Sequence, residues 1–111
     1  MDLFVYGTLM DPVFVQQLTG KAFVTEPARL PDFRRIQTPG SYPYILPHDG
    51  DSVDGMLLRD VDESTLQALD RYEDEGNLYF RTKVVALVDG VPRHCDVYVG
   101  NASAVGQLEI A

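Results

Sequence analysis

The chain opens with Met1-Asp-Leu-Phe-Val-Tyr-Gly-Thr-Leu-Met10, a stretch that decides where the first strand ends and the first helix begins. Residues 3–6 form an apolar run, which is typical of a strand covered on both faces. Gly7 ends this run, and Asp11-Pro12 opens a helix, because Asp is a preferred N-cap and Pro a preferred first helical residue. The corner between the two elements can expose successive N–H groups and so bind an anion. Strands also end in Gly-Thr for purely structural reasons.

The middle of the chain predicts irregular strands joined by loops. The first helix is expected over 12–18, with Gly20 as its C-cap. Residues 22–36 are strand-like, but two prolines indicate bent or edge strands. We expect a loop over 38–44, a turn over 48–51 and a strand over 53–58, in which Gly55 marks a bulge or a close backbone approach.

The last third of the chain carries the clearest elements. A helix is predicted over 63–73, with Asp62 as its N-cap. Asp89-Gly90 is a strong two-residue hairpin signal between strands over 78–88 and 91–99. The tail after Gly100 is expected to fray. Together these elements predict an α+β fold in which about six strands, mostly antiparallel, form a small mixed barrel flanked by short helices.

Length, charge and cysteine content narrow the class of protein. A chain of 111 residues corresponds to one domain, here 1–111. Its net charge of −8 disfavours nucleic acid as a partner. Cys95 is the single cysteine, which rules out an internal disulfide and fits a cytoplasmic location. No signal peptide or membrane span is predicted. His48 lacks a second ligand at metal-binding spacing, so no metal site is expected.

Glu73 is the carboxylate whose position in the helical pattern is unusual. At about 100° per residue, Leu66, Leu69 and Glu73 share one face of the predicted helix. An inward carboxylate is costly unless it is paired or its pKa is raised, and a raised pKa suits a general acid/base near neutral pH. The structural alternatives are an ion pair, for instance with Arg81 or Arg71, and a residue at the helix end whose side chain reaches out to solvent.

Two tyrosines, Tyr42 and Tyr44, are unusual in a loop that only connects strands. They either cover the core or form the wall of a pocket, since tyrosine serves both roles. If the loop were instead an interaction patch, the chain would be an acidic partner-binding domain.

Three short motifs occur in an order that resembles a known family. They are Tyr6-Gly7-Thr8-Leu9, Leu69-Asp70-x-Tyr72-Glu73 and Tyr79-x-Arg81-x-x-Val84. Together they resemble the γ-glutamylcyclotransferase-like family, in particular its AIG2-like branch. The resemblance covers about residues 3 to 99.

The resemblance implies a small barrel and an enzyme without a cofactor. Such enzymes convert a γ-glutamyl amide or peptide into 5-oxoproline and a free amine. Carried onto this chain, it implies Glu73 as the acid/base and Arg81 as a supporting residue. The implied substrate-binding residues are Tyr6, Gly7, Thr8, Leu9, Tyr42 and Tyr79.

The sequence departs from the family pattern directly after Glu73. Family members often continue from the glutamate straight to glycine, whereas Asp74 and Glu75 intervene here. If the helix ended early at Tyr72, the argument from helical phase would weaken and the choice between Glu73 and Glu75 as the functional acid would stay open. A binding module that keeps the pocket without turnover is the alternative to an enzyme, because a fold does not guarantee activity. The substrate's leaving amine and the oligomeric state stay open.

Overall fold

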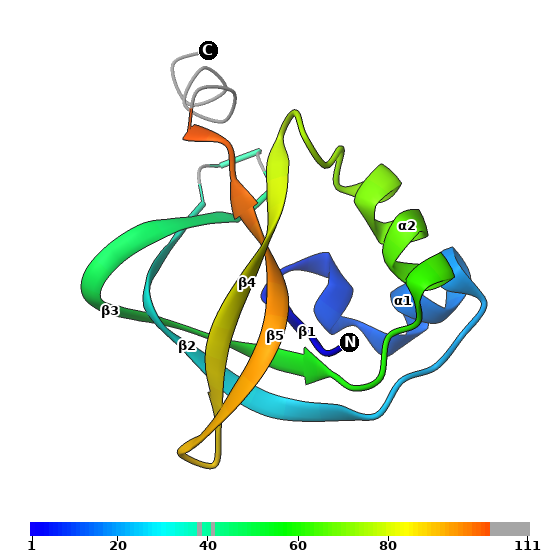
Figure 1. Ribbon diagram of the computed structural model, residues 1–111. Helices are drawn as coiled ribbons and strands as arrows, with labels where there is room; N and C mark the ends of the chain where they lie inside the picture. The colour runs from blue at the N-terminus through cyan, green and yellow to red at the C-terminus, as the bar shows by residue number, and fades with distance from the viewer. Residues whose placement is uncertain (38, 41, 103–111) are drawn as a thin grey trace.

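The computed structural model describes residues 1–37, 39–40 and 42–102 as five strands, two α-helices and a 3₁₀ turn. The strands form a closed barrel in the order β1-β3-β2-β4-β5 (Figure 1). Strand β1 runs parallel to β5, and the other neighbours are antiparallel. The α+β barrel is therefore confirmed, with five strands instead of about six. The elements are β1 (Leu3–Val5), η1 (Thr8–Met10), α1 (Pro12–Thr19), β2 (Thr25–Ile36), β3 (Tyr44–Leu58), α2 (Glu63–Tyr72), β4 (Tyr79–Val88) and β5 (Val91–Gly100).

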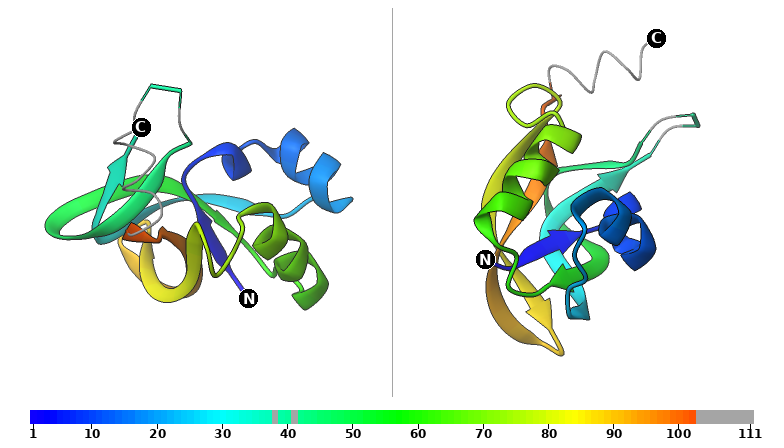
Figure 2. Two further views of the ribbon diagram at one scale, coloured as in Figure 1. Left: turned by 90° about the horizontal axis from the view of Figure 1, so that it is seen from above. Right: turned by 90° about the vertical axis from the view of Figure 1, so that its right-hand side faces the viewer.

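Strand β1 is buried on both faces, as its apolar run predicts. Leu3 and Val5 pack in a cluster with the two helices, whereas Phe4 packs in the second cluster with residues of the other strands. Both helices lie on the same side of the barrel, opposite the bend of β3 (Figures 1 and 2). The first strand therefore packs against both clusters, the one beneath the helices and the one among the other strands.

Gly55 allows β1 to approach β3. A Cβ atom at this position would lie 2.3 Å from the carbonyl oxygen of Val5 and 2.7 Å from Cζ of Phe4. No side chain fits such a gap. The predicted close backbone approach is confirmed.

Strand β3 is longer than predicted because it includes the expected turn. Its register with β2 shifts between Pro31 and Phe33, where residues 48–51 of β3 lie opposite Asp32 alone. Asp32 and Gly50 both adopt positive φ, and the Gly50 N–H donates to the Asp32 carboxylate at 3.1 Å. The expected turn is thus a large bulge within one continuous strand.

Strand β2 contains both prolines and bends, as predicted. It pairs along its length with β3 but meets β4 in one registered pair among the described residues, Arg29 with Leu87. A residue without an N–H is tolerated where a second neighbouring strand is nearly missing. Asp89 and Gly90 both have positive φ and join β4 to β5, which confirms the predicted hairpin.

Helix α2 ends one residue earlier than predicted, and Glu73 becomes its C-cap. Asp62 is the N-cap residue, but its carboxylate makes no side-chain hydrogen bond to the helix backbone. It accepts hydrogen bonds from the Thr65 and Ser64 hydroxyls and pairs with Lys21.

Candidate functional site

A pocket of about 220 Å³ opens where the first strand ends, beside the C-terminal end of α2. It is formed by residues from the β1 exit, η1, the segment before β3, the end of α2, and strands β4 and β5. Among the described residues, its lining consists of Phe4, Val5, Tyr6, Gly7, Thr8, Leu9, Tyr42, Pro43, Tyr72, Glu73, Leu78, Tyr79 and Tyr98. Six of these thirteen residues lie in one stretch, residues 4–9, so the opening sequence forms almost half of the pocket wall.

Glu73 is placed in the pocket by the end of α2. Its backbone N–H donates to the carbonyl oxygen of Leu69 at 2.9 Å, which continues the helical pattern by one residue. Its carboxylate makes no hydrogen bond or ion pair with any described residue. Burial raises the pKa of this carboxyl to about 7. A carboxyl with this pKa exists in both protonation states near neutral pH.

The alternative role of Glu73 as an ion-pair partner is wrong for the described part of the chain. Arg81 instead binds Asp70 and Asp96. Arg71 is exposed and makes no ion pair with Glu73 among these residues. The pKa of Glu73 is therefore raised by burial and is not lowered by a cation.

Three buried phenols surround Glu73, and each donates its proton to another protein group. The Tyr6 hydroxyl donates to the carbonyl oxygen of Tyr98 at 2.5 Å, and the Tyr79 hydroxyl donates to that of Pro43 at 3.0 Å. The Tyr98 hydroxyl donates to the Asp70 carboxylate at 2.7 Å. Because these protons are already used, the phenol oxygens can serve only as acceptors toward a ligand.

Burial and the charge of Glu73 keep these phenols protonated. Burial first, and then Glu73, raises the pKa of Tyr79 to about 12. Burial also raises the pKa of Tyr6 and of Tyr98 far above the ordinary value, and Glu73 adds to both shifts. Glu73 is consequently the pocket group that changes charge near neutral pH.

The corner after β1 turns directly into η1. The N–H groups of Met10 and Asp11 donate to the carbonyl oxygens of Gly7 and Thr8 at 3.0 and 3.2 Å. The first N–H groups of such a turn, here those of Thr8 and Leu9, have no partner within the turn. A Cβ atom at Gly7 would lie 3.2 Å from Cγ of Pro43, so a larger residue would press on the opposite wall.

The structure brings most of the residues implied by the resemblance to one place. The corner residues Tyr6, Gly7, Thr8 and Leu9, together with Tyr42, Glu73 and Tyr79, all line the pocket. Tyr42 stands at the rim with 72% of its surface exposed, whereas Tyr44 is buried in the core at 4%. Of the two roles that the sequence left open, Tyr42 thus has a place in the pocket wall and Tyr44 a place in the core.

Arg81 and Glu75 do not belong to the lining. Arg81 lies behind it, bound to Asp70 and Asp96. Glu75 is exposed, and its backbone N–H donates to the carbonyl oxygen of Asp70 at 2.9 Å. The helix does end at Tyr72, yet Glu73 still faces the pocket and Glu75 does not.

Two polar lining residues, Tyr72 and Tyr98, were missed by the sequence reasoning. The Tyr72 hydroxyl forms a hydrogen bond of 3.1 Å with Oγ1 of Thr8, and its ring packs edge-on against Phe14 at 5.5 Å. A signal for Tyr98 was available, because a two-residue turn at 89–90 fixes the register that pairs Tyr98 with Arg81. The apolar residues missed were Phe4, Val5, Pro43 and Leu78.

None of the helices in the described ranges is both long and apolar enough to cross a membrane. Within those same ranges, no three His, Cys, Asp or Glu side chains are grouped so that they could hold a metal ion.

Comparisons with known proteins place the chain in a family. The family model for "Gamma-glutamyl cyclotransferase, AIG2-like" matches residues 3–110. AIG2-like protein D of Arabidopsis thaliana is 40% identical over 74 residues, which cover 66% of this chain and 49% of that protein. This chain spans about half the length of the curated relatives it matches.

Solved structures have the same fold. A solution structure of an Arabidopsis thaliana protein is 26% identical with a TM-score of 0.82, covering 98% of this chain and 82% of that one. A structure titled "Gamma-glutamyl cyclotransferase" has a TM-score of 0.76 over 91% of this chain and 66% of its own. At 22% identity, the second likeness shows the fold alone. The family match and the shared barrel together show that this chain belongs to the gamma-glutamyl cyclotransferase, AIG2-like family.

Proposed function

We propose that this chain is a γ-glutamylcyclotransferase-type enzyme that cyclises a γ-glutamyl amide or peptide to 5-oxoproline and releases the free amine. One observation carries the proposal. The Glu73 carboxyl, whose pKa burial raises to about 7, shares a pocket with the corner formed by residues 6–9. A group that can accept and return a proton therefore faces backbone groups that can hold an anion.

The first step of the proposed reaction uses Glu73 as a base. The α-amino group of the substrate is an ammonium ion at neutral pH and cannot act as a nucleophile. Glu73 removes one proton, and the amine nitrogen attacks the γ-carbonyl carbon of the same molecule to form the ring C–N bond. Holding the substrate in this folded shape lowers the barrier further, because the attack is intramolecular.

The second step returns the proton. The oxyanion formed on attack collapses, the bond from the γ-carbon to the leaving nitrogen breaks, and protonated Glu73 donates its proton to that nitrogen. The ring nitrogen still carries one extra proton, which Glu73, ionised again, removes and passes to the released amine, so that the products are the neutral lactam and an ammonium ion. The N–H groups of Thr8 and Leu9, which have no partner within the turn, are suited to hold either the oxyanion or the substrate carboxylate. Each turnover leaves Glu73 in its starting state, so the scheme needs no covalent intermediate.

The pocket walls favour a substrate that brings its own N–H donors. Neither lysine nor arginine occurs among the thirteen lining residues. The phenol protons of Tyr6, Tyr79 and Tyr98 are used within the protein, so their oxygens can accept from an ammonium group. Supporting contacts of this kind suit the amino-acid head of a γ-glutamyl compound.

The test is an assay of 5-oxoproline after incubation with γ-glutamyl amino acids and γ-glutamyl amines. We expect the wild type to form product and Glu73→Gln to lose at least about 100-fold in rate, as expected for a general acid/base. Glu75→Gln is the matched control, two residues away and exposed, and should keep full activity.

Two results would contradict the proposal. Full activity of Glu73→Gln would remove Glu73 from the mechanism. Tight binding of γ-glutamyl compounds without any product would instead indicate a binding module with the same pocket.

A further inference from the structure

The position of Glu73 depends on the last turn of α2, because its own carboxylate has no partner among the described residues. The groups that face it from neighbouring elements are the phenols of Tyr6 directly after β1, Tyr79 on β4 and Tyr98 on β5. None of these donates a hydrogen bond to Glu73. Whatever fixes the last helical turn therefore also fixes the carboxylate.

Asp70, three residues before Glu73, ties that turn to the barrel. Its carboxylate accepts two hydrogen bonds from Arg81, from Nε at 2.9 Å and from Nη2 at 3.3 Å. It also accepts the Tyr98 hydroxyl at 2.7 Å. One carboxylate on the helix is thus held by side chains from both strands of the β4–β5 hairpin, and a two-point contact of this kind restricts orientation as well as distance.

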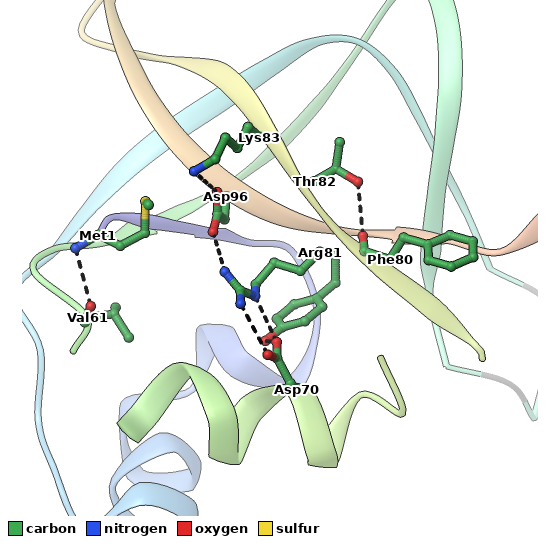
Figure 3. A network of polar contacts seen from close by, with 9 residues as sticks. Met1, Val61, Asp70, Phe80, Arg81, Thr82, Lys83 and Asp96 are labelled. Atoms are coloured by element: carbon green, nitrogen blue, oxygen red, sulfur yellow. Dashed lines mark hydrogen bonds and ion pairs between the residues drawn. The ribbon is translucent and has the colours of Figure 1, made fainter. Parts of the chain in front are cut away.

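Arg81 is itself held from the other side. Its Nη1 donates to Oδ2 of Asp96 at 2.7 Å, and Asp96 is only 2% exposed (Figure 3). The other carboxylate oxygen of Asp96 has no hydrogen bond among the described groups, and Nζ of Lys83 stays 3.9 Å away from it. Arg81 is therefore placed between a buried acid in the barrel and Asp70 on the helix, as Figure 3 shows.

The same contacts reach the pocket floor. Tyr98 lines the pocket, and its carbonyl oxygen accepts the Tyr6 hydroxyl at 2.5 Å. Arg81 and the Tyr98 hydroxyl thus both bind Asp70, and the backbone carbonyl of the same Tyr98 binds Tyr6, which begins the corner of the pocket. The same contacts therefore fix both the end of the helix and the corner.

We propose that Asp70 is a positioning residue, which Arg81 and Tyr98 hold so that the last turn of α2 keeps the Glu73 carboxylate inside the pocket. Asp70 touches no reacting atom in this account. Its kinetic consequence rests on the proposed function, but its structural consequence does not.

The direct test is the titration of the Glu73 carboxyl by NMR on protein labelled with ¹³C at the glutamate side-chain carboxyls. The five glutamates are Glu26, Glu63, Glu73, Glu75 and Glu109, and Glu73→Gln assigns the resonance. In the wild type we expect a midpoint near 7. Asp70→Asn replaces one acceptor oxygen with a donor. In this variant the Glu73 carboxyl should become exposed to water, and its titration midpoint should fall by about one unit or more.

A second test variant, Arg81→Met, removes the side chain that holds Asp70. Arg59→Met is its matched control. Arg59 is a second half-buried arginine bound to two acids, Glu26 and Asp2, at a place outside the pocket lining. Both substitutions should lower thermal stability, but only Arg81→Met should shift the Glu73 midpoint. Should Asp70→Asn not fold, Tyr98→Phe takes its place, because it removes one hydroxyl and keeps the ring.

A Glu73 midpoint that stays near 7 in folded Asp70→Asn, or in Tyr98→Phe if that variant takes its place, overturns the proposal. In the assay for 5-oxoproline, a positioning role predicts that Asp70→Asn and Arg81→Met lower kcat and change KM less than threefold. Arg81→Lys, which keeps the positive charge, should lower kcat less than Arg81→Met does. If the wild type forms no 5-oxoproline, the proposed function fails, whereas the titration still decides the role of Asp70.

Discussion

Glu73 occupies a position where an ionised carboxylate destabilises the fold. Its ordinary pKa is 4.5, and burial raises the value to about 7 in the folded chain. Between these values the folded state holds the proton more firmly than the unfolded state, so the free energy of unfolding falls as pH rises. This loss amounts to at most about 3.5 kcal/mol above pH 7, from about 1.4 kcal/mol per pKa unit. An acid kept under these conditions fits a functional role better than a structural one.

Replacing Glu73 should therefore raise stability. In Glu73→Gln the ionisation is removed, so we expect a higher midpoint of thermal unfolding than in the wild type at pH 8. At pH 4.5, where the wild-type carboxyl is protonated, the two proteins should unfold at nearly the same temperature. Thermal unfolding at both pH values checks this. A variant less stable than the wild type at pH 8 would mean that the carboxylate has a stabilising partner.

Gly7 should affect activity more than stability. The Cβ of Gly7→Ala would press on Pro43, whose carbonyl oxygen accepts the Tyr79 hydroxyl, so the pocket walls should shift. We expect kcat/KM to fall about tenfold, since small misplacements at a reacting centre are costly. The free energy of unfolding should change by less than about 1 kcal/mol, because Pro43 lies at the pocket and can move.

Gly20→Ala is the opposite case and serves as the control. Gly20 ends α1 at φ 75° with no atom near its missing Cβ, so alanine should cost about 1 kcal/mol of stability and no activity. Equal losses of activity in both variants would show that the Gly7 effect is a general one.

At the level of single residues, the sequence predicts the inward position of Glu73 well and the residues around it less well. Helical periodicity alone aims Glu73 inward, because the phase holds even though the helix ends one residue early. Tyr98 lies at the far end of the chain, and only the register of a hairpin brings it beside Arg81. The acceptor role of its hydroxyl depends on Asp70, a tertiary contact that no local pattern contains.

Among the elements, the close approach of β1 to β3 at Gly55 gives a sharp test. Gly55→Ala would place Cβ against the Val5 carbonyl oxygen, a backbone atom that cannot move alone. We expect a loss of about 2 kcal/mol or more in the free energy of unfolding. The neighbouring change Asp54→Ala removes an exposed pair with Arg29 and should cost about 1 kcal/mol or less. Chemical denaturation of both variants checks this, and equal losses would contradict the tight contact.

Elements with strong end signals were predicted closely, and those defined by long-range pairing were not. Asp11-Pro12 and Gly20 delimit α1, and Asp89-Gly90 sets the hairpin. By contrast, the turn signal at 48–51 lies inside one strand, because pairing with β2 resumes on both sides of it. Local residues can predict a bend but cannot tell whether the partner strand continues past it.

For the whole molecule, barrel closure is what brings the parts of the pocket together. The parallel pairing of β1 with β5 joins the first and last strands and places the corner next to Tyr98. The net charge of −8 predicts little about this site, whose chemistry depends on one buried acid. The central claim is thus that Glu73, in this enclosed position, exchanges a proton with a γ-glutamyl substrate.

The measurement that tests this claim most directly is kcat/KM for 5-oxoproline formation between pH 5 and 9. The account predicts that the wild-type value rises through a midpoint near 7 as Glu73 loses its proton, and that this limb disappears in Glu73→Gln together with most of the rate. A Glu73→Gln variant that keeps the wild-type rate and the same pH dependence would contradict the account.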